Sequence, residues 1–334
     1  MMTPNWLYPT PAGLFCEPGN FHIDPSESVD RALITHGHSD HARSGHGHVL
    51  ATSETIAIMK VRYGQWSAGQ FATASYGESL KVNGVNVRFL PAGHILGSAQ
   101  IVMEWGSRRI VVSGDYKRAR DPTCAAFELV PCDVFVSEAT FGLPVFRHGP
   151  AELQIGRLMD SMQRQSERTH LVGCYSLGKC QRIIKMAREA GYDWPIFLHG
   201  AHIALTRLYE TLGQDLGVIR AVNDSTAEDL AGALVLCPPS ATNDRWARRF
   251  DDPVTAFASG WMSVRGRVRQ RGVELPLIIS DHADWPALLD TITSTGAEEI
   301  WLTHGREDAL THQLNGMGLQ ARALSVLGRE EEAE

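Results

Sequence analysis

Residues 36–41 carry a dense set of side chains that can bind metal ions. They read His-Gly-His-Ser-Asp-His and supply three imidazoles and one carboxylate. They follow the apolar run Ala32-Leu33-Ile34, so we expect a loop at the end of a buried strand. Nitrogen and oxygen ligands of this kind suit zinc best, with manganese and iron as alternatives. Because alternate side chains of a tight turn point to different sides, this loop predicts a hydrolytic site with two cations.

A His, Asp or Glu also follows each of five later apolar runs. These residues are His94 after 85–89, Asp115 after 110–112, Glu138 after 134–136, His282 after 277–279 and His304 after 300–302. Buried strands that lie side by side would bring these ends together along one edge of a sheet, where a site can be held rigidly. Each residue alone could be an ordinary polar group of a loop. Five in the same position favour a shared site.

Seven other histidines lack this placement, and we interpret them as surface or core residues. They are His46, His48, His148, His170, His199, His202 and His312. His46 and His48 form a Ser-Gly-His-Gly-His turn that could also bind metal, but they do not follow an apolar run. We therefore leave them out of the predicted site.

Length and composition predict a globular protein with about two domains. The chain has 334 residues, of which 43% are hydrophobic and 21% charged. No apolar stretch approaches the roughly 18 residues of a membrane span, and the N-terminus lacks the regions of a signal peptide. The six cysteines form no CxxC pair, so we expect buried thiols of a reduced cytosol and a cytoplasmic protein without a membrane contact.

Strands and helices alternate between residues 141 and 265, which predicts a small parallel α/β domain inserted between Glu138 and His282. Within it, Gly173 to Lys179 match the first seven positions of a P-loop, GxxxxGK. Cys180 replaces the Ser or Thr that would hold Mg²⁺, which argues against a nucleotide triphosphate site. Lys179 at a helix N-terminus still predicts contact with a phosphate of another ligand.

The net charge of −7 argues at first against a polyanionic substrate, but the charges are unevenly distributed. Residues 142–275 hold 17 Lys and Arg against 14 Asp and Glu. Arg265, Arg267 and Arg269 belong to a group of seven arginines within residues 245–271. Because arginine suits phosphate recognition, these three are candidate substrate-binding residues. The alternative is a solvated face.

Six motifs in order, HGHSDH, AGHILGSA, SGD, SEAT, SDHAD and THG, resemble those of the metallo-β-lactamase superfamily, and in particular its β-CASP nucleases. The opening WLYPTPAG and the later Ile-Asp-Pro are similar to bacterial ligase-associated DNA-damage-response exonucleases, often labelled mRNA 3′-end processing factors. The resemblance implies an αββα sandwich with an inserted α/β β-CASP cap. The expected bounds are 1–143 for the first part of the metallo-β-lactamase domain, 144–265 for the cap and 266–334 for the return segment.

The resemblance also implies the role of each site residue. One metal would be held by His36, His38 and His94, the other by Asp40, His41 and His304, with Asp115 bridging both. Asp24 would orient the loop, His282 would be the general acid, Glu138 would support it, and Ser98 would bind phosphate or pack. Zinc is expected at both positions, with manganese as the alternative. A bridging hydroxide between the metals would attack the phosphodiester.

The same resemblance implies a metal-dependent DNA exonuclease of DNA repair, working with an ATP-dependent DNA ligase and a helicase. His304 is typical of the RNA-cleaving members, whereas Asp281 before His282 is typical of the DNA group, and Arg306 departs from the usual Glu. An RNA-processing or RNA-degrading nuclease is therefore the alternative. The third alternative is a nucleic-acid-binding subunit without catalytic activity, or a hydrolase of small esters. The full ligand set argues against the former, and the basic insertion argues against the latter.

Overall fold

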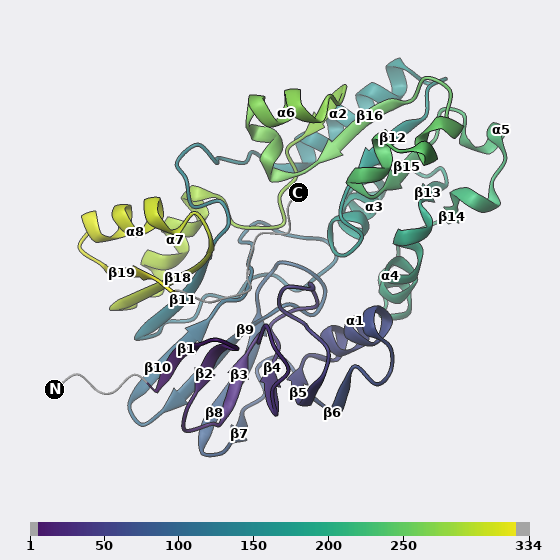
Figure 1. The fold of residues 1–334 in the computed structure, drawn as a ribbon. Coiled ribbons are helices and arrows are strands. Elements are labelled where there is room, and N and C mark those ends of the chain that lie inside the picture. The colour runs from purple at the N-terminus through teal and green to yellow at the C-terminus, as the bar shows by residue number, and fades with distance from the viewer. Residues whose placement is uncertain (1–5, 325–334) are drawn as a thin grey trace. The chain divides into compact units, whose positions relative to one another are not determined.

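The chain forms a mixed α/β structure with three sheets, in agreement with the α/β class predicted (Figure 1). The structure is a computed structural model that describes residues 6–324. The chain divides into two compact units, of which the second is Phe146–Asp281 and the first is formed by the chain on either side of it.

The first unit begins with a six-stranded sheet. Its strands, in spatial and chain order, are β1 (Leu7–Thr10), β2 (Gly13–Cys16), β3 (Phe21–Ile23), β4 (Arg31–Leu33), β5 (His46–Ala51) and β6 (Ala68–Thr73). Helix α1 (Ser53–Tyr63) covers one face through Ile56 and Met59, which pack on Ala32, Val49 and Ala51. The loop between β4 and β5 carries residues 36–41, as the apolar run before them predicted.

The second sheet of this unit has seven strands. In spatial order they are β19 (Gln320–Ala323), β18 (Glu299–Gly305), β11 (Val134–Ala139), β10 (Arg108–Val112), β9 (Ala99–Trp105), β8 (Val85–Pro91) and β7 (Leu80–Val82). Helices α7 (Trp285–Ser294) and α8 (Glu307–Gly316) cover one face. β10, β11 and β18 are parallel neighbours, so their carboxyl ends lie at the same edge.

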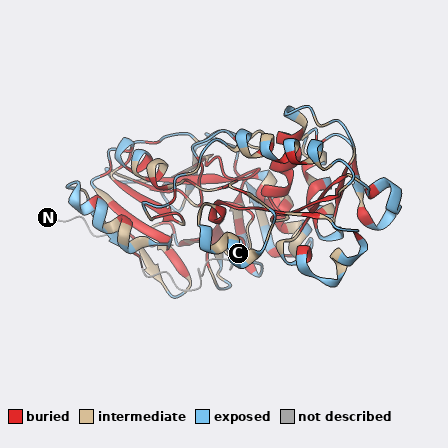
Figure 2. Cartoon of the chain, turned by 90° about the horizontal axis from the view of Figure 1, so that it is seen from above, coloured by how far each residue is buried: buried red, intermediate tan, exposed pale blue. Residues whose placement is uncertain are grey.

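One buried cluster joins the remaining faces of these two sheets. Leu33 of β4 packs into it, whereas the preceding Ala32 faces α1. Ile110 and Val112 of β10 belong to the same cluster, whereas Val111 between them faces the helices on the other side. The alternation follows from the two-residue period of a strand. Both faces of each sheet are thus buried, and the strands appear as the red core of Figure 2.

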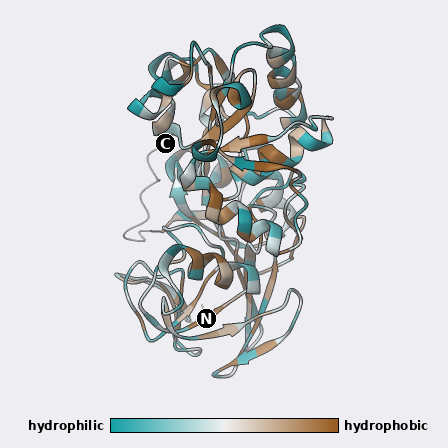
Figure 3. Ribbon diagram, turned by 90° about the vertical axis from the view of Figure 1, so that its right-hand side faces the viewer, coloured by the Kyte–Doolittle hydropathy of each residue, from teal (hydrophilic) through white to brown (hydrophobic). Residues whose placement is uncertain are grey.

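The second unit is built on a parallel sheet of its own. In spatial order its strands are β14 (Ile219–Ala221), β13 (Ile196–Leu198), β15 (Leu234–Cys237), β12 (His170–Gly173), β16 (Val254–Ala258) and β17 (Leu275–Leu277). Its helices are α2 (Ala151–Arg164), α3 (Lys179–Glu189), α4 (Gly200–Thr211), α5 (Ala227–Leu230) and α6 (Arg265–Arg271). Short 3₁₀ turns are Val222–Asp224, Pro239–Asn243, Arg245–Arg249 and Gly260–Ser263. Figure 3 shows hydrophobic stretches along these strands.

The end of the second unit differs from the boundary expected at residue 265. The unit continues to Asp281, because β17 pairs in parallel with β16 and so completes its sheet. The strand expected over 277–279 is therefore shifted to Leu275–Leu277. An apolar run shows that a strand is buried, but it does not show which of two sheets the strand joins.

Two further expectations concern membrane-spanning helices and the cysteines. None of the helices among residues 6–324 is long and apolar enough to cross a membrane. All six cysteines are thiols, and five of them are buried; the exception is Cys124.

Candidate metal centre

The 36–41 loop is held in place by a buried carboxylate. Asp24 lies just after β3 and accepts hydrogen bonds from the backbone amide of Thr35 (2.7 Å) and from its hydroxyl (2.5 Å). The other contact is to His41, whose Nδ1 lies 2.7 Å from Asp24 Oδ2. An imidazole that donates Nδ1–H to a carboxylate presents Nε2 as its ligand atom. Asp24 thus has the position expected for a residue that orients the loop.

Four side chains form the first group of ligand atoms. His36, His38, His94 and Asp115 each offer one atom, and these atoms all lie within 4.8 Å of one another. His38 Nδ1 lies 3.1 Å from His36 Nε2 and 3.0 Å from His94 Nε2, and His36 Nε2 lies 3.4 Å from Asp115 Oδ2. Ligands bound at about 2.0–2.2 Å to one zinc ion are separated by similar distances.

Three side chains form the second group, namely Asp40, His41 and His304. His41 Nε2 lies 3.4 Å from Asp40 Oδ2, and His304 Nε2 lies 3.9 Å from the same oxygen. The rings of His41 and His304 are stacked with centroids 4.7 Å apart. Asp115 Oδ2 also lies 3.4 Å from His41 Nε2, so one oxygen contacts both groups. A carboxylate in this position could contact cations at both groups.

His304 reaches the second group through a distorted strand end. It is the penultimate residue of β18, at a register shift where Glu138 pairs with Thr303 and Ala139 pairs with Gly305. Its φ of 62° lies in the left-handed region, which is uncommon for a residue with a side chain. Such a bulge re-aims a side chain at the end of a strand.

Gly114 lets the Asp115 loop approach the 36–41 loop. Its φ is 57°, and a Cβ atom there would lie 2.7 Å from side-chain atoms of Thr35. The contact places the Ser-Gly-Asp segment after β10 directly against the residue that precedes His36. Glycine is therefore required at this position both for its backbone conformation and for the close approach.

The electrostatics of the centre suit divalent cations. Burial, together with the nearby His41, lowers the pKa of His36 to about 4, so its imidazole is neutral near neutral pH. Burial opposes ionisation of Asp115, but the charge of His41 and the contacts with His36 and His41 together outweigh burial and hold the pKa of Asp115 well below its usual range. His41 itself is fully buried, yet Asp115, Asp40 and Asp24 raise its pKa well above the usual value. A proton on His41 thus supplies positive charge that a cation would replace.

Two buried polar atoms support the fit of a metal. Nε2 of His41 and Oδ1 of Asp115 are inaccessible to solvent and make no hydrogen bond within residues 6–324. A buried polar group without such a partner is costly, at about 1–3 kcal/mol. Cations coordinated at this point would satisfy both residues, so the donor set and its unsatisfied atoms agree.

His282 lies beside the two groups, next to a buried glutamate. Its Nδ1 is 2.8 Å from Glu138 Oε2, while Glu138 Oε1 accepts the backbone amide of Tyr116 at 2.6 Å. Burial raises the pKa of Glu138, and the nearby His282 opposes this shift. His282 Nδ1 is also 3.9 Å from Asp115 Oδ2, and Asp115, Glu138 and His282 form a third group of candidate ligands. The position fits a proton donor to the reacting group, and a metal ligand is the other role the geometry permits.

Ser98 and Lys179, both candidate phosphate ligands, are buried and engaged in other contacts. Ser98 Oγ accepts the backbone amides of His94 (3.1 Å) and Ile95 (3.2 Å), so it shapes the loop that carries His94. Lys179 is only 2% exposed, and its Nζ lies 3.3 Å from Asp281 Oδ2. Neither position favours direct contact with a phosphate. Both residues have a structural role that residue type alone did not reveal.

The three candidate arginines lie on α6. Arg265 and Arg269 are exposed, whereas Arg267 is half-buried and stacks on Trp261, with its guanidinium carbon 3.9 Å from the ring centroid. Two of the three are thus available at the surface of the second unit.

The strand-end pattern predicted ligands from one sheet edge, but they do not all come from one edge. His94 and Asp115 follow strands of the seven-stranded sheet, and Glu138 and His304 are the penultimate residues of two others. Residues 36–41 follow β4 of the other sheet. His282 comes from the segment between β17 and α7. The site therefore lies where the ends of two packed sheets meet. The excluded histidines His46 and His48 belong to β5, and Val29 and Asp30 contact their rings.

Thr35 is a site residue that the sequence analysis missed. Its hydroxyl donates to Asp24 and lies 3.1 Å from His36 Nδ1 and 3.4 Å from His41 Nδ1. It thus contacts two candidate ligands at once. Its place directly before His36 was the available signal, but a threonine at a strand end is too common to single out.

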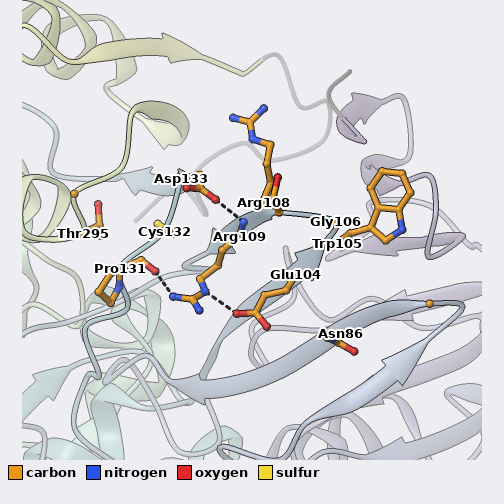
Figure 4. A pocket seen from close by; sticks show the side chains of 13 residues that line it. Asn86, Glu104, Trp105, Gly106, Arg108, Arg109, Pro131, Cys132, Asp133 and Thr295 are labelled. Carbon is orange, nitrogen blue, oxygen red and sulfur yellow. Dashed lines mark hydrogen bonds and ion pairs between the residues drawn. The ribbon is translucent and has the colours of Figure 1, made fainter. Parts of the chain in front are cut away.

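A cavity of about 620 Å³ lies at the other end of the same strands (Figure 4). Arg109 lies at the start of β10, and Asp133 directly precedes β11. The polar groups there already pair with one another: Arg109 with Glu104 at 2.7 Å, and the Arg109 amide with Asp133 at 2.6 Å. The candidate metal ligands are elsewhere, so this cavity is separate from the centre.

Comparisons with known proteins give relatives for most of the chain. No protein-family model matches it. It is 26% identical over 315 residues to a "Probable DNA ligase" of Opitutus terrae, covering 93% of this chain and 30% of that protein. It is 28% identical over 223 residues to "Cleavage and polyadenylation specificity factor subunit 3-I" of Arabidopsis thaliana, covering 57% and 32%. It is 31% identical over 202 residues to "Ribonuclease TTHA0252" of Thermus thermophilus, covering 52% and 46%.

The chain thus spans between about a third and a half of the length of these relatives. A solved structure, of a protein of unknown function from Enterococcus faecalis V583, shares the fold with a TM-score of 0.59 at 13% identity. That likeness covers 87% of this chain and 78% of the solved one.

Proposed function

We propose that this relative of the β-CASP metallo-β-lactamase nucleases is itself a metal-dependent nuclease that hydrolyses phosphodiester bonds. The resemblance that the six motifs indicated is confirmed by relatives of that group, among them Ribonuclease TTHA0252 and the plant cleavage and polyadenylation factor subunit. The observation that carries the proposal is the pair of ligand groups that share Asp115 Oδ2. We take the first unit as the metallo-β-lactamase αββα sandwich and the second as its β-CASP cap.

The residues of the centre then divide the work of hydrolysis. His36, His38 and His94 would hold one cation, Asp40, His41 and His304 would hold the other, and Asp115 lies within reach of both groups. Two cations held here would supply stabilisation of the attacking and leaving oxygens and would lower the pKa of water. Zinc fits this donor set best, and manganese is the alternative.

His282 protonates the leaving oxygen. Its Nδ1 donates to Glu138 Oε2, so Nε2 is the atom that exchanges the proton with substrate. Glu138 is fully buried, and the amide of Tyr116 fixes its second oxygen at 2.6 Å. The carboxylate therefore holds the imidazole in one orientation.

We propose DNA as the substrate class and digestion from an end as the mode of cleavage. The support is the match to the ligase-named chain, which extends over 93% of this sequence, whereas the RNA-named relatives match little more than half. A similar segment within a ligase-named protein favours a role in DNA repair beside a DNA ligase, and a helicase partner is an extension of the same idea. RNA cleavage is the second candidate, because several relatives are named as ribonucleases or endoribonucleases.

Matched DNA and RNA strands test the proposal. Single-stranded and duplex oligonucleotides of one sequence, labelled at either terminus, are incubated with the full chain and Zn²⁺, Mn²⁺ or Mg²⁺, and products are sized over time. Stepwise shortening of DNA, absent in the Asp115→Ala variant, is expected. Faster cleavage of RNA would select the second candidate. Intact strands under all metals would overturn the nuclease assignment.

A further inference from the structure

A second cluster of possible metal ligands lies entirely inside the second unit. Cys174 directly follows β12, Cys180 is the second residue of α3, and His202 lies in α4 (Figure 1). Their ligand atoms all lie within 4.8 Å of one another, and all three residues are fully buried. None of them belongs to the centre of the first unit, and that centre contains no sulfur ligand.

The imidazole of His202 is the observation that points to a ligand. Both ring nitrogens are buried and find no hydrogen-bond partner of normal geometry within residues 6–324. The Cys180 thiol lies beside them. His170, in the same unit and equally buried, behaves differently. Its Nε2 lies 2.9 Å from Ser161 Oγ and its Nδ1 lies 3.0 Å from the Arg168 carbonyl oxygen. A core histidine of this unit is therefore normally satisfied, whereas His202 faces two thiols.

The elements that carry the cluster are fixed to one another. Gln181, next to Cys180, donates from Nε2 to Thr206 Oγ1 at 2.9 Å and so joins α3 to α4. Its Oε1 accepts the amide of Gly178 at 2.8 Å, which holds the turn before the helix. The amide of Cys174 donates to the Cys237 carbonyl at 2.9 Å, which holds the end of β12 against β15. The three ligand atoms are thus placed by rigid elements, as a metal site requires.

We propose that Cys174, Cys180 and His202 bind a zinc ion in the second unit. Two thiolates and one imidazole are soft ligands, which zinc accepts and which magnesium and calcium do not favour. Binding breaks the two S–H bonds, forms two Zn–S bonds and releases the two protons to solvent, with no change of oxidation state. Water completes the four ligands of a tetrahedral zinc. The proposal goes beyond the nuclease function and does not depend on it.

Cobalt substitution tests the site without any assay of activity. The purified full chain is stripped of metal under reducing conditions and loaded with Co²⁺, and its near-ultraviolet spectrum is recorded. Cobalt bound to thiolate gives an intense charge-transfer absorption, whereas the His and Asp ligands of the first unit give none. We expect this absorption, and we expect an excess of Zn²⁺ over all three proposed metal positions to abolish it. Its absence in the wild-type chain would overturn the proposal.

Matched cysteine variants assign the signal. Cys180→Ala should remove the absorption and lower the zinc content of the purified protein by one ion per chain. Cys132→Ala, a buried cysteine of the first unit, should keep both. Absorption that persists in the double variant Cys174→Ala/Cys180→Ala would contradict the assignment. So would intact-mass and alkylation data showing that Cys174 and Cys180 form a disulfide in the purified protein.

Discussion

The two ligand clusters of this chain differ in their access to solvent. In the first unit, His38, Asp40 and His282 are partly exposed, and the site lies on loops at the ends of strands. In the second unit, Cys174, Cys180 and His202 are completely buried between a strand and two helices. Partial exposure lets a substrate reach the metal ligands, whereas full burial suits an ion that holds elements together. The difference teaches that a cluster's chemistry must be judged together with its accessibility.

Removal of the shared carboxylate should have the largest effect. Asp115→Ala takes away the one oxygen that contacts both ligand groups, so we expect turnover to fall to background and metal content in the first unit to drop. The loss of turnover should exceed the roughly 10–100-fold loss that is typical when a residue only supports a metal ligand. Elemental analysis beside the cleavage assay checks this. The thiolate–cobalt signal of the second unit should persist, and its loss would show that the clusters are not independent.

The second largest effect is expected for His282→Ala. Loss of a general acid slows turnover by about 10²–10⁴, while both metals of the first unit are retained. A leaving group that needs no proton should be cleaved almost normally by the variant, which separates this role from a structural one. Loss of metal would instead identify His282 as a ligand, as its place in a group with Asp115 and Glu138 permits.

Asp24→Asn should have a smaller effect. The variant replaces the carboxylate that contacts His41 Nδ1 and Thr35 by a neutral amide, which weakens these contacts. Metal affinity or turnover should therefore fall about 10–100-fold. Asp30→Asn is the control, because Asp30 pairs with His48 on the surface, 3.4 Å apart, away from the centre. Metal titration of both variants measures the difference. Equal behaviour of the two would show that the buried contact does not orient the loop.

Neutralising the arginines of α6 should change binding more than turnover. Replacing Arg265, Arg267 and Arg269 by Gln should weaken affinity and flatten its salt dependence by up to about 0.7 per lost phosphate contact on single strands. Arg207→Gln is the control, because Arg207 already pairs with Glu210 at 2.6 Å. Binding is measured across a salt series. An unchanged slope would assign the three residues to a solvated face.

The smallest effect on activity should come from the second cluster. Cys180→Ala should leave turnover within about twofold but lower the thermal midpoint. For a domain of this size, each kcal/mol of lost stability shifts the midpoint by about 2–4 °C. Added zinc should raise the midpoint of the wild type and not of the variant. A similar rise of the thermal midpoint in the wild type and the variant would show that Cys180 does not bind the added zinc.

The sequence predicted the strand ends that carry the candidate ligands, because their signal is local. A short apolar run followed by a His or an acid is visible in ten residues. His94 and Asp115 follow strands as expected, and His304 is the penultimate residue of one. The assembly of those ends was harder to foresee. β17 joins the sheet of the second unit, and His282 comes from a loop, because sheet membership depends on pairing between distant segments.

Residue type alone also predicted contacts that burial does not favour. Ser98 and Lys179 were candidates for phosphate, but one caps the amides of its own loop and the other pairs with Asp281. The proximity of His202 to two cysteines was not foreseen, because these residues were interpreted as ordinary core or surface residues. Cys174, Cys180 and His202 are brought together by α3 and α4, and their spacing along the chain matches no familiar ligand motif.

The left-handed backbone of His304 has a consequence for variation at this position. An asparagine tolerates that conformation at lower cost than most side chains, so His304→Asn should fold at least as well as the native chain while losing a candidate ligand. Selection for thermostability alone would therefore accept a sequence that selection for turnover rejects. At this bulge, stability of the fold and binding of a metal therefore favour different residues.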